Sequence, residues 1–170
     1  MKIQFILVPL ALVALSGCGQ KGPATSADGP GHTAAHAAGT APTSSARTIE
    51  ITANDQMKYS LTTITAAPGE ELRVVLTNAG SLPKEAMGHN WVLIQAGMDP
   101  IAFGASAAGA RETQYIPTNQ KEKIIAHIDL LGPRQTGEVT FKAPAQPGTY
   151  PFLCTFPGHA ALMRGTLTVE

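Results

Sequence analysis

The feature that most constrains the fold is a series of short segments, from residue 48 to the C-terminus, in which apolar and polar residues alternate. Ile49 and Ile51 alternate with polar neighbours. Leu72, Val74 and Leu76 do the same. A period of two places every second side chain on one face, which is typical of half-buried β-strands. The other expected strands are residues 89–95, 123–131, 137–142, 149–154 and 165–169.

Residues that favour turns separate these segments. The turn signals are Pro68-Gly69, Asn78-Ala79-Gly80, Gly132-Pro133 and Gln146-Pro147-Gly148. Many short strands joined by turns predict an all-β domain over residues 48–170, either an antiparallel sandwich or a Greek-key barrel. Hydrophobic residues make up 44% of the chain, which is enough for a core. Residues 99–110 depart from the pattern because they are rich in alanine, and we expect a short helical or irregular flap there.

The N-terminus has the character of a targeting segment. Residues 1–17 combine Lys2 with an apolar run that suits a secretory signal and is too short for a typical membrane-spanning helix of about 20 residues. The run ends in Leu15-Ser16-Gly17-Cys18, which resembles the lipobox of bacterial lipoproteins. We therefore expect a lipoprotein signal peptide, cleavage before Cys18 and lipidation of its thiol. The alternative is an ordinary cleaved signal peptide with an incidental cysteine.

Residues 18–47 differ sharply in composition from the domain that begins at residue 48. Ala, Gly, Pro, Ser and Thr dominate, and no large apolar residue occurs. Such a segment buries too little surface to offset the entropy of ordering it, so the sequence predicts a disordered tether with a reach of roughly 30 Å. His32 and His36 lie in this tether and could collect metal ions. The alternative is that both are solvated linker residues.

Charge and cysteine content exclude two classes of protein. Lysine and arginine total 12, as do aspartate and glutamate, so the formal net charge is zero. This balance gives no electrostatic basis for binding nucleic acid. The two cysteines, Cys18 and Cys154, have very different surroundings. A disulfide framework is therefore not expected.

The residues that carry chemistry gather near the C-terminus. Cys154, His159 and Met163 have the spacing Cys-x4-His-x3-Met across a turn at Pro157-Gly158. A strand that ends at Cys154 and a return strand after the turn would bring these side chains to one point. His89 opens another expected strand. Two imidazoles, a thiolate and a distant thioether form the donor set of a blue-copper site, because sulfur ligands suit Cu(I) and imidazoles accept Cu(II).

Each of these residues has a simpler explanation when it is taken alone. Cys154 could be a buried structural thiol and Met163 a core residue. His89 and His159 could be hydrogen-bonded histidines. A nucleophilic Cys–His pair is a further alternative. However, the loop offers no acid or amide that would orient a catalytic base.

The sequence from about residue 49 to residue 169 resembles the cupredoxins, and within them the azurins and auracyanins. The segments that carry the resemblance are Asn54-Asp55-Gln56-Met57, Leu82-Pro83-Lys84, Met87-Gly88-His89-Asn90-Trp91-Val92-Leu93, Ile125-Ala126-His127 and the loop 154–163. The resemblance implies an eight-stranded Greek-key barrel with one copper ion near one end. It also implies that the Gly88 carbonyl lies opposite Met163 as a second weak axial contact. Asn90 would tie the His89 segment to the Cys154 loop, as expected for a residue that supports metal ligands.

The resemblance also implies a route for electrons. It places the ring edge of His159 at the end of the barrel, within an uncharged apolar surface that we call the electron port. In this chain the port would be drawn from Leu82, Ala86, Met87, Phe156, Pro157 and Ala160. The further histidine of the domain, His127, would lie on the surface away from copper.

Two features depart from the family pattern. Azurins carry a disulfide near the start of the barrel, at positions that fall near Arg47 and Gly69-Glu70 in this chain, where there is no cysteine. The first strand is therefore expected to be held by strand pairing and packing alone. The flap at residues 99–115 also matches poorly, because it is richer in small residues.

Together these features predict a mononuclear type 1 copper protein. It would shuttle single electrons between redox proteins of the cell envelope, such as c-type cytochromes or terminal reductases and oxidases. One alternative is an envelope protein that binds and stores copper. Another is a copper enzyme, but an enzyme would need an open coordination position or a second metal centre, so we expect no enzymatic activity. Gly19 stands where inner-membrane lipoproteins commonly carry aspartate, which favours a periplasm-facing anchor in the outer membrane.

Overall fold

The computed structural model describes residues 45–170, so Cys18, His32 and His36 lie outside the described residues. The strands are β1 (Arg47–Asn54), β2 (Lys58–Tyr59), β3 (Thr63–Ala66), β4 (Glu71–Asn78), β5 (His89–Ile94), β6 (Ile124–Leu131), β7 (Thr136–Lys142), β8 (Gly148–Leu153) and β9 (Arg164–Val169). The helices are α1 (Lys84–Met87) and α2 (Pro100–Ala107), with the 3-10 turns η1 (Arg111–Thr113), η2 (Thr118–Lys123) and η3 (His159–Ala161). Within this part of the chain, no helix is both long and apolar enough to cross a membrane.

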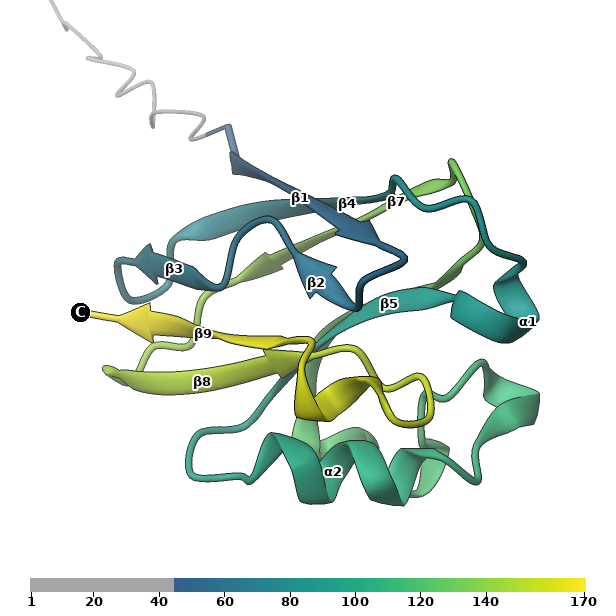
Figure 1. Cartoon of the computed structure of the whole chain (residues 1–170). Coiled ribbons are helices and arrows are strands. Elements are labelled where there is room, and N and C mark those ends of the chain that lie inside the picture. Colours follow the sequence, from purple (N-terminus) through teal and green to yellow (C-terminus); the bar gives the residue numbers. More distant parts are fainter. Residues whose placement is uncertain (1–44) are drawn as a thin grey trace, which may run out of the picture. The chain divides into compact units, whose positions relative to one another are not determined.

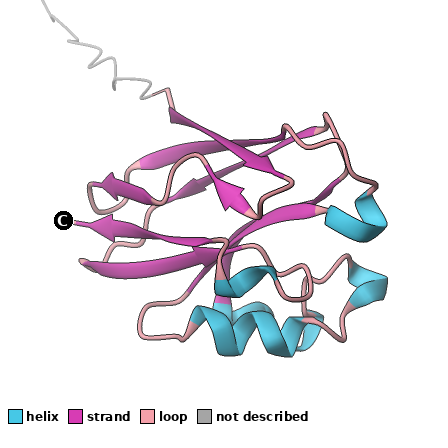
Figure 2. Cartoon of the chain, viewed as in Figure 1, coloured by secondary structure: helices cyan, strands magenta, loops and turns pink. Residues whose placement is uncertain are grey.

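The strands form two sheets that pack face to face (Figures 1 and 2). The first sheet has the order β2-β1-β4-β7 and the second has the order β3-β9-β8-β5-β6. Every second residue of β4 lies in the core between the sheets, and Leu72, Val74 and Leu76 are fully buried. Ile49 and Ile51 of β1 are buried beside them. The expected all-β sandwich is therefore confirmed, with nine strands in residues 45–170, one of which has only two residues.

Two strand pairs are parallel, a detail that neither the alternation nor the turn pattern predicts. β1 pairs with β4 in parallel, and β3 pairs with β9 in parallel. After the β1–β2 hairpin the chain leaves the first sheet for β3 and then returns as β4, so β4 runs in the same direction as β1. Such crossings depend on how the two sheets are stacked, which alternation along the sequence does not specify.

Strand β5 is buried on both faces, and the flap at residues 99–115 explains why. Trp91 and Leu93 face the core between the sheets, whereas Val92 and Ile94 pack against Phe103 of α2 in a second apolar cluster. Helix α2 begins where Asp99 Oδ1 accepts hydrogen bonds from the backbone N–H groups of residues 101 and 102. Proline at its first position suits that start. The expected flap is therefore a helix, and it covers the outer face of the strand that begins with His89.

An ion pair joins Arg47 and Glu70, near the two positions where azurins carry a disulfide and this chain has no cysteine. Arg47 Nε lies 2.6 Å from Glu70 Oε1, and Arg47 also donates to the Thr65 carbonyl. Glu70 Oε2 accepts the Ala67 N–H at 2.9 Å. The guanidinium and then this N–H hold the pKa of Glu70 below its ordinary value. The expectation that pairing and packing alone hold β1 is therefore wrong, because a charged contact closes the same loop.

This ion pair predicts a pH-dependent contribution to stability. Glu70→Gln should lower the free energy of unfolding by roughly 0.5 to 1 kcal/mol at about pH 7, as is typical of an exposed ion pair. Folding lowers the Glu70 pKa, so the contribution is present above the ordinary value of 4.5 and is lost as the pH falls through the folded value. Urea unfolding curves of the two proteins should therefore separate at neutral pH and converge once the pH falls below the lowered pKa of Glu70 in the folded protein.

Glu71→Gln is the matched control, because Glu71 is the next residue and has no ion pair among the described residues. Equal stabilities of wild type and Glu70→Gln at neutral pH would contradict the role assigned to the Arg47–Glu70 pair.

Candidate metal centre

The expected metal ligands lie at one end of the sandwich because of the way β5 and β8 pair. The two strands are antiparallel neighbours, with Val92 opposite Leu153. The start of β5, where His89 stands, therefore lies at the same end of the sheet as the end of β8, which Cys154 follows. The loop after Cys154 then folds back to β9 and carries His159.

Three side chains converge at this end of the molecule. The nearest ligand atoms of His89, Cys154 and His159 all lie within 4.8 Å of one another, and all three residues are buried. Cys154 Sγ is 3.5 Å from His159 Nδ1. The centroids of the two imidazole rings are 5.1 Å apart. His127 is exposed on β6, where its Nε2 lies 3.6 Å from Asp129, and it takes no part in this cluster.

Backbone hydrogen bonds hold the loop from Cys154 to Met163 in a compact turn. The Met163 N–H donates to the His159 carbonyl at 2.8 Å, and the Cys154 N–H donates to the Met163 carbonyl at 2.9 Å. Gly158 has a φ of +83°, a left-handed conformation that costs glycine little. Met163 is fully buried, and its assignment as an axial ligand stays a prediction.

Gly88 is held too tightly for any other residue. A Cβ at this position would lie 2.6 Å from the Lys84 carbonyl oxygen and 2.9 Å from the Leu130 side chain. Glycine therefore lets the segment before His89 pass close to α1 and β6. The weak contact of its carbonyl with a metal ion stays a prediction.

Burial sets the protonation state of all three donors. It raises the pKa of the Cys154 thiol to about 11, although the N–H groups of Asn90 and Phe156 oppose the shift. Burial also lowers the pKa of His159 to about 4, with a further decrease from the charge of His89. The pKa of His89 is lowered by burial as well, against the opposing effects of the Asn54 carbonyl and the Asp55 charge. Neutral imidazoles and a thiol that loses its proton to a metal are the forms that bind transition metals.

The His89 ring tests whether a metal ion fits here. Neither of its buried ring nitrogens completes a hydrogen bond of normal geometry among the described residues, although the Asn54 carbonyl lies near enough to oppose the lowering of the His89 pKa. An unpaired buried polar group costs about 1 to 3 kcal/mol, so native structures seldom leave one without a role. A copper ion bound by one His89 nitrogen, the Cys154 thiolate and His159 would use this free donor. The donor set of two imidazoles and a thiolate also suits copper in both oxidation states.

A reciprocal pair of hydrogen bonds joins the His89 segment to the Cys154 loop. Asn90 Nδ2 donates to Thr155 Oγ1 at 2.7 Å, and the Thr155 N–H donates to Asn90 Oδ1 at 2.8 Å. Both residues are fully buried. The Thr155 hydroxyl continues to the Tyr115 carbonyl at 2.7 Å. Sequence reasoning assigned Asn90 this role but missed Thr155, although its position directly after Cys154 could have indicated it.

Two other supporting residues were not predicted. The Tyr59 hydroxyl donates to the Asn90 carbonyl. Burial raises the pKa of Tyr59 well above its ordinary value, and the charge of a Cys154 thiolate raises it further. Asp55 Oδ2 accepts the N–H and the hydroxyl of Ser81, at 2.8 and 3.0 Å. The Ser81 N–H is the largest cause of the lowered Asp55 pKa. Asp55 lies in the segment 54–57 that carries the family resemblance, but the sequence alone gave it no function.

The residues expected to form the electron port are only partly exposed. Leu82, Ala86 and Pro157 lie at the surface and Met87 is half-buried. Phe156 and Ala160 are buried. Tyr115 packs edge-on against Phe156, and α2 lies so close to Ala160 that a Cβ at Gly104 would be 2.5 Å from the Ala160 Cβ. Leu162 of the same loop, which sequence reasoning left out, is 65% exposed.

Comparisons with known proteins agree with this geometry. The family model of copper-binding proteins of the plastocyanin/azurin family matches residues 46–170. The chain belongs to this family. Azurin from Pseudomonas aeruginosa is 38% identical over 126 residues, which cover 72% of this chain and 84% of that protein.

Two solved structures are similar to this cupredoxin. Reduced auracyanin from Roseiflexus castenholzii matches with a TM-score of 0.65 and 34% identity, and covers 74% of this chain and 98% of its own. An azurin from Methylomonas sp. strain J matches with a TM-score of 0.65 and 30% identity. The match covers 74% of this chain and 99% of the azurin. With the His89–Cys154–His159 cluster, these similarities identify the cupredoxin as a type 1 copper electron-transfer protein with one copper ion. Storage of copper is not favoured.

Removing the Asn90 side chain should loosen residues 154–163 of this cupredoxin, which we call the copper loop. Asn90→Ala leaves the Thr155 N–H buried without a partner, so we expect the free energy of unfolding to fall by about 1 to 3 kcal/mol. The thiolate-to-copper absorption band and the reduction potential should also shift, because the Cys154 loop is no longer tied to β5. Urea unfolding, visible absorption and potentiometry would measure these changes.

Asn78→Ala is the matched control, because Asn78 is also buried and hydrogen-bonded but lies at the end of β4. It should lower stability and leave the absorption band in place. An identical band and potential in Asn90→Ala would contradict the bridging role.

Proposed function

We propose that this cupredoxin is anchored by lipid in the cell envelope and exchanges single electrons with redox proteins through the His159 end of the domain. Bound copper supplies the chemistry, since it accepts and releases one electron between Cu(II) and Cu(I). His89, Cys154 and His159 would hold the ion, with Met163 and the Gly88 carbonyl as weak axial contacts.

The observation that carries this proposal is the burial of all three donors in one cluster. A site sealed from water excludes further ligands and holds its donors in nearly one geometry, so little rearrangement accompanies the gain or loss of an electron. The same enclosure would slow the entry and exit of the ion. For both reasons the site suits electron transfer better than delivery of copper or catalysis at an open metal.

The axial role of Met163 gives the first test. A weak, distant thioether tunes the reduction potential but does not set the plane of the three strong ligands. Met163→Gln should therefore lower the potential and keep a coloured site, as measured by potentiometry and visible absorption. Complete loss of copper binding would instead make Met163 a primary ligand and contradict its assignment.

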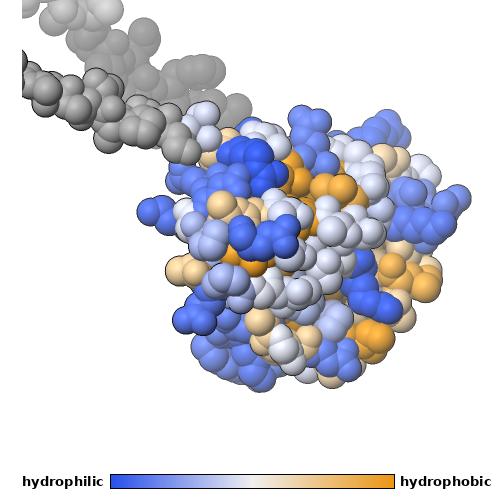
Figure 3. All heavy atoms as spheres, turned by 90° about the vertical axis from the view of Figure 1, so that its left-hand side faces the viewer, coloured by the Kyte–Doolittle hydropathy of each residue, from blue (hydrophilic) through white to orange (hydrophobic). Residues whose placement is uncertain are grey.

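The surface around His159 suits contact with another redox protein. His159 itself is 3% exposed, and the loop 156–163 contains no charged residue. Leu162 of this loop is 65% exposed and adds apolar surface there, and Leu82, just before α1, is 43% exposed. An uncharged apolar surface loses little hydration on contact, which is typical of docking sites. The opposite end of the sandwich, which faces the viewer in Figure 3, is mainly hydrophilic.

A charge placed at this surface should slow electron exchange between two copies of the protein. In Met87→Lys the two ammonium groups, at about 4 Å in the contact, would repel by about 1 to 4 kcal/mol. Self-exchange should therefore slow at least about fivefold, the factor that corresponds to about 1 kcal/mol. NMR line broadening in mixtures of reduced and oxidised protein measures this rate.

Thr149→Lys is the control. Thr149 is exposed at the other end of β8, so the substitution adds the same charge far from the metal centre. Equal self-exchange rates in Met87→Lys and Thr149→Lys would mean that electrons leave elsewhere.

The proposed location rests on the N-terminal sequence. Cys18 in its lipobox-like setting would carry the lipid, residues 18–47 would tether the domain, and Gly19 favours the outer membrane. We infer partners on the periplasmic side, such as c-type cytochromes or terminal reductases and oxidases. Cys18→Ser should block processing or release the domain into the soluble fraction, as seen by fractionation and mass spectrometry. Wild-type protein that is fully soluble and unmodified at Cys18 would contradict the anchor.

A further inference from the structure

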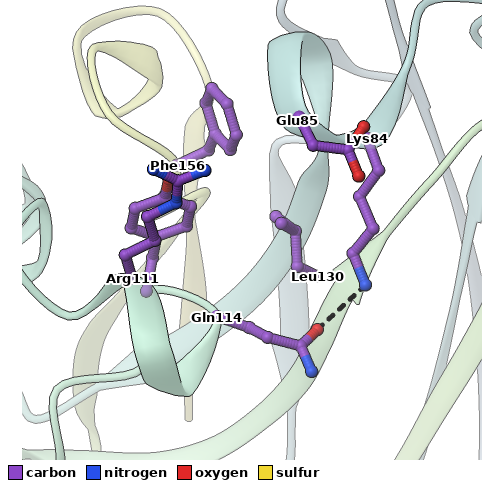
Figure 4. A pocket seen from close by; sticks show the side chains of 7 residues that line it. Lys84, Glu85, Arg111, Gln114, Leu130 and Phe156 are labelled. Carbon is purple, nitrogen blue, oxygen red and sulfur yellow. Dashed lines mark hydrogen bonds between the residues drawn. The ribbon is translucent and has the colours of Figure 1, made fainter.

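A pocket of about 280 Å³ opens beside the metal centre. Helix α1 contributes Lys84 and Glu85 to its lining. Turn η1 and the residues after it contribute Arg111, Gln114 and Tyr115, and the copper loop contributes Phe156. Figure 4 shows Arg111 and Phe156 on one side of the pocket and Lys84 and Glu85 on the other.

The pocket is separated from a copper ligand by one side chain. The Phe156 ring packs against the His159 ring with centroids 4.6 Å apart. Tyr115 contacts the same phenylalanine edge-on at 5.2 Å. Helix α1 leads directly into Gly88 and His89. A group bound in the pocket would therefore lie next to the path by which electrons reach His159.

The pocket carries more positive than negative charge. Lys84 Nζ donates to Gln114 Oε1 at 3.0 Å, which holds the ammonium group across the pocket (Figure 4). Arg111 makes no side-chain hydrogen bond and no ion pair to any of residues 45–170. Glu85 is not paired with either cation in the same part of the chain. The lining thus holds two positive charges and one negative charge, a net charge of +1.

The wall of the pocket is built on an unfavourable backbone. Gln114 and Tyr115 have φ angles of 55° and 64°, a left-handed conformation that few residues other than glycine adopt. The Tyr115 N–H donates to the Ala110 carbonyl at 2.8 Å, and the Tyr115 carbonyl accepts the Thr155 hydroxyl at 2.7 Å. Because Thr155 follows Cys154, this wall is fixed relative to the copper loop.

We propose that Lys84 and Arg111 bind an acidic side chain on the docking surface of the protein redox partner. A guanidinium offers two parallel donors to a carboxylate, and an ammonium adds a third from the opposite wall. The pair would seat the partner over Phe156 and His159, and would steer an acidic surface towards this end of the domain. This inference rests on the proposed exchange of electrons at the His159 end.

The first experiment locates the anion site without electron transfer. Hexacyanochromate(III), a redox-inert paramagnetic trianion, is added to the isotope-labelled Cu(I) protein. Amide signals of residues 84–85 and 111–115 should broaden first, and the effect should be lost in Lys84→Gln/Arg111→Gln. The control Lys142→Gln, at the far end of β7 opposite Glu71, should keep it. Broadening that centres elsewhere, such as at Lys121 and Lys123, would overturn the proposal.

The second experiment measures electron transfer from the reduced copper protein to an acidic and to a basic c-type cytochrome of similar potential. With the acidic cytochrome, Arg111→Gln and Lys84→Gln should each slow the rate about fivefold at low salt, the factor for unit charges in contact in water. With the basic cytochrome neither should slow it, and Lys142→Gln should change neither rate. An equal loss with both cytochromes would overturn the proposal. Failure of the electron-transfer function itself would abolish every rate, wild type included, and leave the anion map unchanged.

Discussion

The structure depends on keeping two imidazoles and a thiol together, out of water, with the His89 ring unpaired. Burial without partners costs about 1 to 3 kcal/mol for each polar group, and burial of a charge would cost far more. The donors therefore remain neutral in the absence of metal, as the lowered pKa values of both histidines and the raised pKa of Cys154 indicate. His89 and the deprotonated thiolate of Cys154 would hold a copper ion here, and binding it would offset this cost.

The sandwich can hold this arrangement because hydrogen bonds and packing fix the segments that carry the three donors. The Asn90–Thr155 bonds join two segments that are distant in sequence, and Tyr59 secures Asn90 from the first sheet. Helix α2 covers the outer face of β5 and so buries both sides of the strand that begins with His89. Rigid ligands of this kind suit an electron carrier, because the donor geometry need not change with the charge of the metal. His159 keeps 3% of its surface exposed, within a loop, residues 156–163, that contains no charged residue.

Much of the fold was predictable from local patterns. Alternation in β1 and β4 indicated half-buried strands, and the spacing of Cys154, His159 and Met163 indicated a loop that folds back on itself. The parallel pairing of β1 with β4 was not predictable, because it depends on the path of the chain between sheets. The burial of Phe156 and Ala160 depends on how the flap packs, and the Arg47–Glu70 pair joins residues that only the folded chain brings together. Thr155 was missed because a threonine has no chemistry that marks it as a support for a metal site.

Electron transfer by this protein depends on copper bound by the Cys154 thiolate within the cluster that His89 and His159 complete. The most direct measurement is the visible absorption spectrum of the copper-loaded, oxidised protein, beside that of Cys154→Ser. A thiolate bound to Cu(II) in this set of ligands gives an intense charge-transfer band at the red end of the spectrum. We expect that band in the wild type, and its loss in Cys154→Ser with the β-rich circular dichroism spectrum retained. A wild type without the band, or a Cys154→Ser protein that stays intensely blue, would contradict this assignment.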